Sequence, residues 1–124
     1  MTKSDCEVIL NRIITLSEDK KVNLISTFNV SQDMWYTDYI VVLTVGNPIH
    51  CRALIETFKT DLLPEIATLN SVDFHDEIKQ SGSPESGWVI LDLNSILIHC
   101  VTESARDFYK LDSIYEKYGV IHHH

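Results

Sequence analysis

The sequence has little that would place it in a membrane, in an oxidising compartment or on a nucleic acid. No stretch reaches the roughly 18 apolar residues that a membrane-spanning helix needs, and the N-terminus lacks the pattern of a signal or transit peptide. The three cysteines, Cys6, Cys51 and Cys100, are odd in number and far apart. Such a set indicates reduced thiols rather than a disulfide framework, so we expect a cytoplasmic protein.

Basic side chains are scarce as well. The chain has 10 lysines and arginines against 18 aspartates and glutamates, a formal net charge of −8, and no basic cluster beyond Lys20-Lys21. Proteins that follow the phosphates of a nucleic acid need clustered positive charge. The composition therefore disfavours direct nucleic-acid binding and favours a basic surface, such as that of a basic protein, as the partner.

The composition is that of one soluble globular domain. The chain has 124 residues, of which 44% are hydrophobic and 23% charged, enough for one core and too few for two ordinary domains. No internal repeat or proline-rich linker is present. We predict a single domain over residues 1–121. We interpret His122-His123-His124 as the remnant of a purification tag, with a native metal-binding tail as the alternative.

Apolar periodicity predicts the order α-β-β-α-β-β-β-α. Residues 5–19 have helical spacing, and Asn47-Pro48 provide an N-cap and a first turn for a second helix that runs to about Pro64. A last helix follows Thr102-Glu103 and carries the apolar residues Ala105, Phe108, Tyr109 and Leu111. The predicted strands are 22–28, 39–45 (central and buried on both faces), a weaker one at 71–78, and, after a turn-rich loop over 80–87, the two runs 88–93 and 96–101. The sequence thus predicts a mixed α/β (α+β) domain with a roughly five-stranded sheet flanked by helices.

The last two strands form a predicted hairpin around Asn94-Ser95. This turn pairs residue 92 with 97, 91 with 98 and 90 with 99. One face of the hairpin is then wholly apolar and belongs to the core, whereas the other face mixes an aromatic, aliphatic and polar residues, as protein-binding surfaces do. The alternative is that a helix covers this second face, with Asp92 and His99 paired beneath it. The candidate partner-binding residues are Trp88, Ile90, Asp92, Leu97 and His99.

A nucleotidyl transferase is a weak alternative. Gly82-Ser83 followed by Asp92 and Asn94 is similar to the Gly-Ser…Asp-x-Asp pattern of those enzymes, which use two carboxylates to hold divalent cations. Here the second acid is replaced by Asn94, at a predicted turn, and no room is left after Ser83 for a phosphate-binding helix. The sequence also has no Walker-type loop and no Rossmann glycine triplet.

Metal and thiol chemistry have little support either. His99 and Cys100 are neighbours on a strand and so point to opposite faces, where they cannot share an ion. A nucleophilic pairing of Cys51 with a distant histidine remains open, although a buried structural Cys51 is favoured. We expect no catalytic residue, no metal and no cofactor.

Three blocks of the sequence together form a distinctive pattern. The first block is residues 38–42 (DYIVV) leading to Gly46-Asn47, and the second is residues 87–92 (GWVILD). The third block consists of Ile98-His99, Glu103, Arg106, Phe108-Tyr109 and Leu111-Asp112. In order and spacing these blocks resemble the ribosomal silencing factor family, also called RsfS or Iojap-like proteins. Together they cover roughly residues 15 to 115, although Pro48 stands where the family usually has serine.

The resemblance implies a fold related to nucleotidyl transferases without their catalytic acids, and a function that is not enzymatic. It implies that the protein binds ribosomal protein L-fourteen on the large ribosomal subunit, blocks subunit association and represses translation. Two alternatives from other classes remain open. One is a nucleotide-binding or transferase-like enzyme. The other is a homodimeric structural module that buries the face around Trp88 against a second copy.

Overall fold

A mixed β-sheet forms the centre of the molecule. The computed structural model describes residues 3–32, 34, 37–69, 78–110, 113 and 120–123. In this part of the chain the sheet has the strand order β3-β4-β5-β2-β1-β6, with β2 and β5 parallel and every other pair antiparallel. Strands β1, β2, β4 and β5 match predicted strands, whereas β3 and β6 are additional. The strands are β1 (Leu24–Asn29), β2 (Tyr39–Val45), β3 (Lys79–Ser83), β4 (Trp88–Asp92), β5 (Ile96–Thr102) and β6 (Val120–His123).

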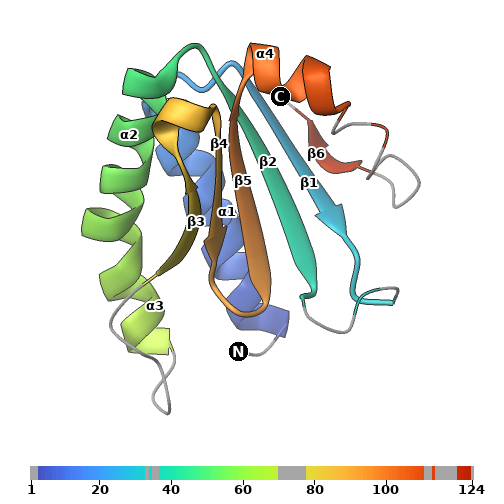
Figure 1. The fold of residues 1–124 in the computed structure, drawn as a ribbon. Helices are drawn as coiled ribbons and strands as arrows, with labels where there is room; N and C mark the ends of the chain where they lie inside the picture. The colour runs from blue at the N-terminus through green and yellow to red at the C-terminus, as the bar shows by residue number, and fades with distance from the viewer. Residues whose placement is uncertain are drawn as a thin grey trace.

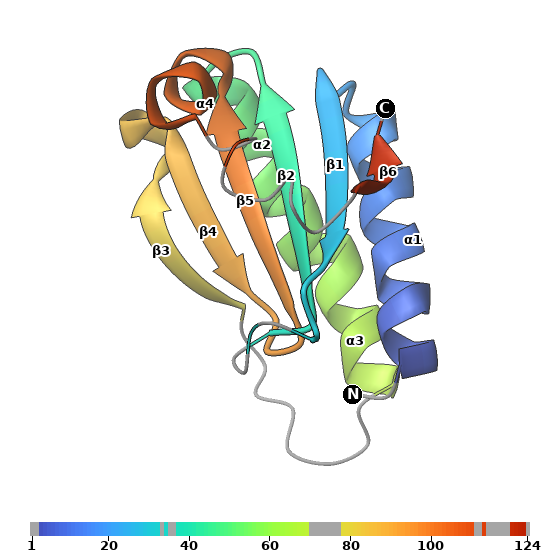
Figure 2. The same ribbon diagram turned by 90° about the vertical axis from the view of Figure 1, so that its right-hand side faces the viewer.

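The helices lie unequally on the two faces of the sheet. Helices α1, α2 and α3 cover one face, whereas α4 lies on the opposite face, at one end (Figures 1 and 2). None of the described helices is long and apolar enough to cross a membrane. The helices are α1 (Lys3–Asp19), α2 (Pro48–Thr57), the π-helical segment η1 (Phe58–Leu62), α3 (Leu63–Leu69), the short 3-10 helix η2 (Pro84–Ser86) and α4 (Glu103–Tyr109).

The main core lies between the sheet and helices α1 to α3. Strand β2 is buried at all seven positions, as predicted for a central strand, because it has β1 and β5 on its two sides and a hydrophobic cluster on each face. The predicted hairpin register is confirmed: Asp92 pairs with Leu97 and Ile90 with His99. The apolar face of the hairpin is buried against α2 and its neighbours, as expected, through Val89, Leu91, Leu93, Ile96, Ile98 and Cys100.

The second helix begins as predicted but continues beyond Pro64. Asn47 is its N-cap, with Oδ1 accepting a hydrogen bond of 2.9 Å from the backbone N–H of His50. The expected end near Pro64 is wrong, because α3 runs on to Leu69. In the π-helical segment the N–H of Leu63 reaches the carbonyl of Phe58, five residues back. This wider turn accommodates a proline, which cannot donate a hydrogen bond and crowds the carbonyl four residues before it in an α-helix.

The region before the hairpin contains one untested prediction and one that is wrong. The weak strand expected at 71–78 lies mostly outside the described residues. The loop predicted over 80–87 is wrong in its first half, which forms β3. This segment is polar, but its backbone pairs with β4 from Lys79 to Ser83, and a ladder of backbone hydrogen bonds does not require apolar side chains. The sequence pattern does not predict β6, which pairs with β1 and takes in His122 and His123. The interpretation of these histidines as a tag remnant stays a prediction.

Candidate functional site: an aromatic surface on the open face of the sheet

The face of the sheet opposite α1 to α3 carries the candidate site. We call it the open face and define it by the outward-facing residues of the hairpin, which are Trp88, Ile90, Asp92, Leu97, His99 and Val101. Here Trp88 pairs with Val101 across the hairpin, and Ile90 with His99. Trp88 and Leu97 are half-buried and pack on a second, smaller hydrophobic cluster on the open face. The buried members of that cluster are Phe28, Val30, Ile40, Val42 and Val101.

His99 lies beneath Trp88 and is not a surface residue. It is 3% exposed, and the indole Nε1–H of Trp88 donates a hydrogen bond of 2.9 Å to its Nδ1. Burial lowers the pKa of His99 to about 4, so the ring is neutral near pH 7 and its Nδ1 can accept. The prediction that His99 contacts a partner directly is therefore replaced by a supporting role under Trp88.

Asp92 is exposed at the turn end of the hairpin and does not pair with His99. Its Oδ1 accepts a hydrogen bond of 2.7 Å from the backbone N–H of Asn94, which stabilises the left-handed backbone of Asn94 (φ 76°) in the turn. The alternative in which Asp92 and His99 pair beneath a covering helix is wrong, because Asp92 is exposed to solvent, whereas His99 is buried and accepts from Trp88. Asp92 remains accessible to a partner.

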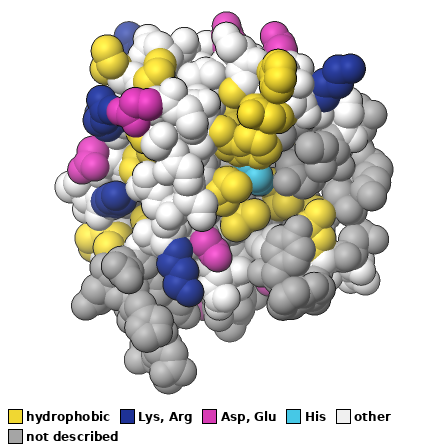
Figure 3. Space-filling view, in the orientation of Figure 1, with side chains coloured by type: hydrophobic (Ala, Val, Ile, Leu, Met, Phe, Trp, Pro, Cys, Tyr) yellow, Lys and Arg dark blue, Asp and Glu magenta, His cyan; other side chains and the backbone are white. Residues whose placement is uncertain are grey.

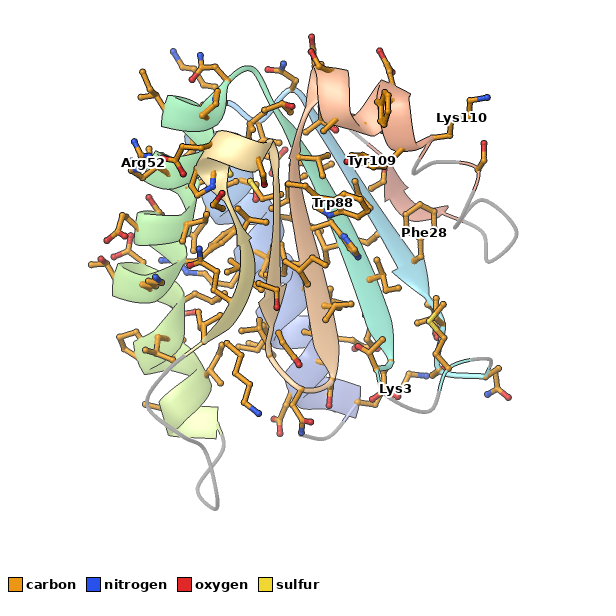
Figure 4. All side chains as sticks on the ribbon, viewed as in Figure 1. Lys3, Phe28, Arg52, Trp88, Tyr109 and Lys110 are labelled. Atoms are coloured by element: carbon orange, nitrogen blue, oxygen red, sulfur yellow. The ribbon has the colours of Figure 1, made fainter. Side chains whose placement is uncertain are left out.

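Helix α4 extends the site beyond the hairpin. The ring centroids of Trp88 and Tyr109 are 4.8 Å apart, and those of Tyr109 and Phe108 are 4.9 Å apart. Phe108 is 79% exposed and Tyr109 49% exposed. We call these three residues, Trp88, Tyr109 and Phe108, the aromatic row. Figure 3 shows hydrophobic side chains gathered over this end of the open face, and Figure 4 shows Tyr109 above Trp88.

A shallow hollow lies beside the aromatic row. It has a volume of about 270 Å³ and is lined by Ser81, Gly82, Ser86, Trp88, Ile90 and Tyr109. The hollow therefore lies between strands β3 and β4 and helix α4, and both apolar side chains and serine hydroxyls line it. A hollow next to exposed aromatic rings is suited to receive a side chain of a protein partner.

Sequence reasoning did not assign Phe108 and Tyr109 to the site. It placed both among the apolar residues of the last helix without saying which face they occupy. No clear signal was present, because adjacent residues on a helix differ by about 100° and can both face one core, as Ile9 and Leu10 of α1 do.

The described residues give little support to enzymatic chemistry. Among them, no group of three or more His, Cys, Asp and Glu side chains could hold a metal ion. Ser83 begins only the three-residue helix η2, which is too short for a phosphate-binding helix, and Asn94 lies in the turn as predicted. His99 faces the open side while Cys100 lies in the main core, so the expected separation of these neighbours is confirmed.

Cys51 is a structural residue, as favoured from the sequence. It is fully buried in the main core, where reactants cannot reach it. The hydrogen bond between the two thiols lowers the pKa of Cys51 and, together with burial, raises the pKa of Cys100. Cys51 therefore has the lowered pKa without the access, and Cys100 has neither. A thiol nucleophile needs access and a lowered pKa, and this pair of core cysteines does not offer the combination.

The fold and the sequence were compared with known proteins. Residues 3–123 match the family model described as "Ribosomal silencing factor during starvation". A curated relative, the ribosomal silencing factor RsfS of Treponema pallidum, is 29% identical over 98 residues, which are 79% of this chain and 81% of the relative.

Two solved structures have the same fold. A crystal structure of a Chromobacterium violaceum protein superposes with a TM-score of 0.68 at 21% identity, covering 88% of this chain and 84% of that one. A crystal structure of a Bacillus halodurans protein superposes with a TM-score of 0.65 at 18% identity, covering 88% and 94%. The family model spans nearly the whole chain, including the hairpin and α4 that build the aromatic row. The chain therefore belongs to the family of ribosomal silencing factors.

Proposed function

We propose that this protein docks through its open face on ribosomal protein L-fourteen of the large ribosomal subunit and thereby keeps the small subunit from joining. In this proposal the protein is a cytoplasmic repressor of translation that acts by steric obstruction and performs no catalysis. The family supports a role in silencing ribosomes. The site on L-fourteen follows from the family resemblance, and the features below support the surface that would contact it.

The observation that carries the proposal is the exposure of the aromatic row. Large aromatic residues are enriched at the energetic centres of protein interfaces, where they insert into pockets of the partner. Phe108 presents almost its whole side chain to solvent, which is costly for an isolated protein and is explained by a partner that covers it. The exposed rings of the aromatic row can insert into a pocket of the partner, and the neighbouring hollow can accept a side chain of the partner.

Charge supports a basic partner. The protein has a formal net charge of −8, and ribosomal proteins are commonly basic because they sit against RNA. Complementary charge mainly accelerates and orients the encounter, whereas the desolvated aromatic contacts supply most of the affinity. The two features therefore have separate experimental signatures, a salt-dependent association rate and a mutation-sensitive dissociation rate.

The test is retention of purified bacterial ribosomal subunits on the immobilised protein, followed by a subunit-association assay on sucrose gradients. We expect the large subunit to be retained and the small subunit not, and we expect added protein to decrease the fraction of joined ribosomes. Phe108→Ala should weaken retention at least about tenfold, as truncation of an interface anchor does. Retention of neither subunit, or of both equally, would contradict the proposal.

A matched control is available on the other layer of the molecule. Ile49 is a hydrophobic residue of α2 that is 75% exposed, close to the exposure of Phe108, but α2 covers the opposite face of the sheet (Figure 1). Ile49→Ala removes a comparable exposed surface and should leave retention unchanged. If both variants lose binding to the same degree, the loss reflects surface hydrophobicity in general and not the aromatic row.

A further inference from the structure

Helix α4 is held on the sheet by an unusual contact. The helix has seven residues, and its described buried side chains are Ala105 and Arg106. Ala105 contributes little apolar area because it is small, so hydrophobic burial alone gives this helix a weak attachment. The polar contacts of α4 must therefore decide where it lies.

Arg106 makes the deepest of these contacts. Its side chain is 6% exposed, and Nη1 donates a hydrogen bond of 2.5 Å to Oγ1 of Thr44. Thr44 lies on β2, the central strand, and points toward the open face. A guanidinium is rarely buried to this extent, since the loss of hydration must be offset by hydrogen bonds of good geometry. The helix is thus fastened to the middle of the sheet by a charged side chain.

The start of α4 is fixed independently. The N–H of Thr102 donates to the carbonyl of Gly87 at 2.9 Å, and a Cβ added to Gly87 would lie 2.9 Å from Oγ1 of Thr102. Glu103 Oε1 also accepts a hydrogen bond of 2.8 Å from Asn23. With its first residue anchored beside β4, the helix can still pivot, and Arg106 is the next point that restrains it.

We propose that Arg106 is the positioning residue of the docking surface. By binding Thr44 it sets the orientation of α4 and so holds Tyr109 against Trp88 and directs Phe108 outward. Tyr109 and Phe108 follow Arg106 within one helical turn, so a rotation of the helix at Arg106 displaces both rings. This inference rests on the proposed function in that it assigns Arg106 a role at that same surface, while Arg106 itself does not touch the partner.

The first measurement is a double-mutant cycle on large-subunit binding. Arg106→Met keeps an unbranched side chain like the aliphatic part of arginine and removes the hydrogen-bond donors, and we expect it to weaken binding about tenfold, as loss of the anchor does. In the Phe108→Ala background the same change should cost less than about threefold, because residues that act through one contact are not additive. Additive losses would show that Arg106 acts elsewhere and would overturn the inference.

The second measurement does not depend on the ribosome. In a Trp35→Phe background Trp88 is the remaining tryptophan, and its emission reports whether Tyr109 covers it. Arg106→Met should shift this emission to the red and increase its quenching by acrylamide. Arg52→Met is the matched control, because Arg52 forms an ion pair with Glu85 on the surface, and it should change neither quantity. An unchanged Trp88 signal in Arg106→Met would overturn the inference.

The positioning role of Arg106 can be distinguished both from the proposed function and from a general loss of folding. If the wild-type protein retains no large subunit while Arg106→Met still exposes Trp88, the proposed function fails and the positioning role stands. If Arg106→Met does not fold, Thr44→Val replaces it, since this change removes the hydroxyl that accepts from Arg106 and keeps the side-chain shape. Thr44→Val should expose Trp88 and weaken binding in the same direction, and no effect on either would refute the role of the Arg106–Thr44 contact.

Discussion

The indole Nε1–H of Trp88 and the imidazole Nδ1 of His99 are joined by a hydrogen bond of 2.9 Å across strands β4 and β5. The two rings are tilted by 41°, with centroids 5.8 Å apart. Because His99 is buried and neutral, it serves as a fixed acceptor for a half-exposed tryptophan. The orientation of Trp88 thus depends on the protonation state of His99 beneath it.

Acid should destabilise the protein through His99. The pKa of His99 is lowered from 6.5 to about 4 in the folded state by burial, so between these pH values the unfolded chain binds a proton that the folded chain does not. The contribution of His99 to the free energy of unfolding is fully present above pH 6.5. It is lost as the pH falls toward 4, which lowers the free energy of unfolding by about 3 kcal/mol in total. The measurement is the free energy of unfolding in urea as a function of pH for the wild type and His99→Gln.

Glutamine is the matched substitution because its amide oxygen can accept from the indole without titrating. We expect the stability of His99→Gln to fall less steeply than that of the wild type over this range. Parallel curves would mean that His99 is protonated equally easily in the folded and unfolded states.

Trp88→Ala should weaken binding of the large subunit by about 2 kcal/mol or more, as truncation of an interface anchor does. We expect a cost in stability as well, of about 1 to 2 kcal/mol, because Trp88 packs on the second hydrophobic cluster. Affinity is measured by titration and stability by urea unfolding, at a temperature where the variant is folded. Binding of normal strength by a folded Trp88→Ala would remove Trp88 from the docking surface.

Salt should slow the encounter with a basic partner. The net charge of −8 predicts that the association rate with the large subunit falls markedly from low to physiological ionic strength, with a smaller change in the dissociation rate. Stopped-flow or surface-based kinetics over a salt series measures both. An association rate that does not change across the salt series would show that charge complementarity does not contribute to binding.

Gly82→Ala should destabilise the edge of the sheet. Gly82 has φ 80°, and a Cβ at this position would collide with the backbone carbonyl of Trp88. A methyl group must therefore shift β3 away from β4, at a cost of about 1 to 3 kcal/mol. Gly46→Ala is the control, since nothing lies within 4 Å of an added Cβ there. Equal urea midpoints for the two variants would show that β3 does not hold Gly82 in this conformation.

Nucleotides should not bind with the help of a metal. The open face of the hairpin offers Asp92 as its one carboxylate, and the residue at the second position of the transferase pattern is Asn94, which carries no charge. Too few hard ligands are then available to displace water from a divalent cation. Calorimetric titration with magnesium or manganese and each nucleoside triphosphate should give no heat of binding. Micromolar, metal-dependent binding that is lost in Asp92→Asn would overturn the non-catalytic assignment.

Much of the hairpin was predictable because its signals are local. A two-residue turn of Asn94-Ser95 sets the register, and strict alternation then sorts every side chain to one face or the other. The helix start at Asn47-Pro48 is equally local. The continuation past Pro64 was not predictable, because it depends on a π-helical segment whose widened turn has no simple sequence pattern.

The sequence by itself determined which hairpin residues share a face, that β2 is a central strand, and that Asn94 stands where the transferase pattern has its second acid. Only the tertiary structure decided that His99 is a buried support for Trp88, that Asp92 braces its own turn, and that Phe108 and Tyr109 belong to the candidate surface. The physical reason is the separation of the groups along the chain. Alternation and turn chemistry act between neighbours, whereas the position of α4 depends on a buried Arg106 that reaches Thr44, 62 residues away.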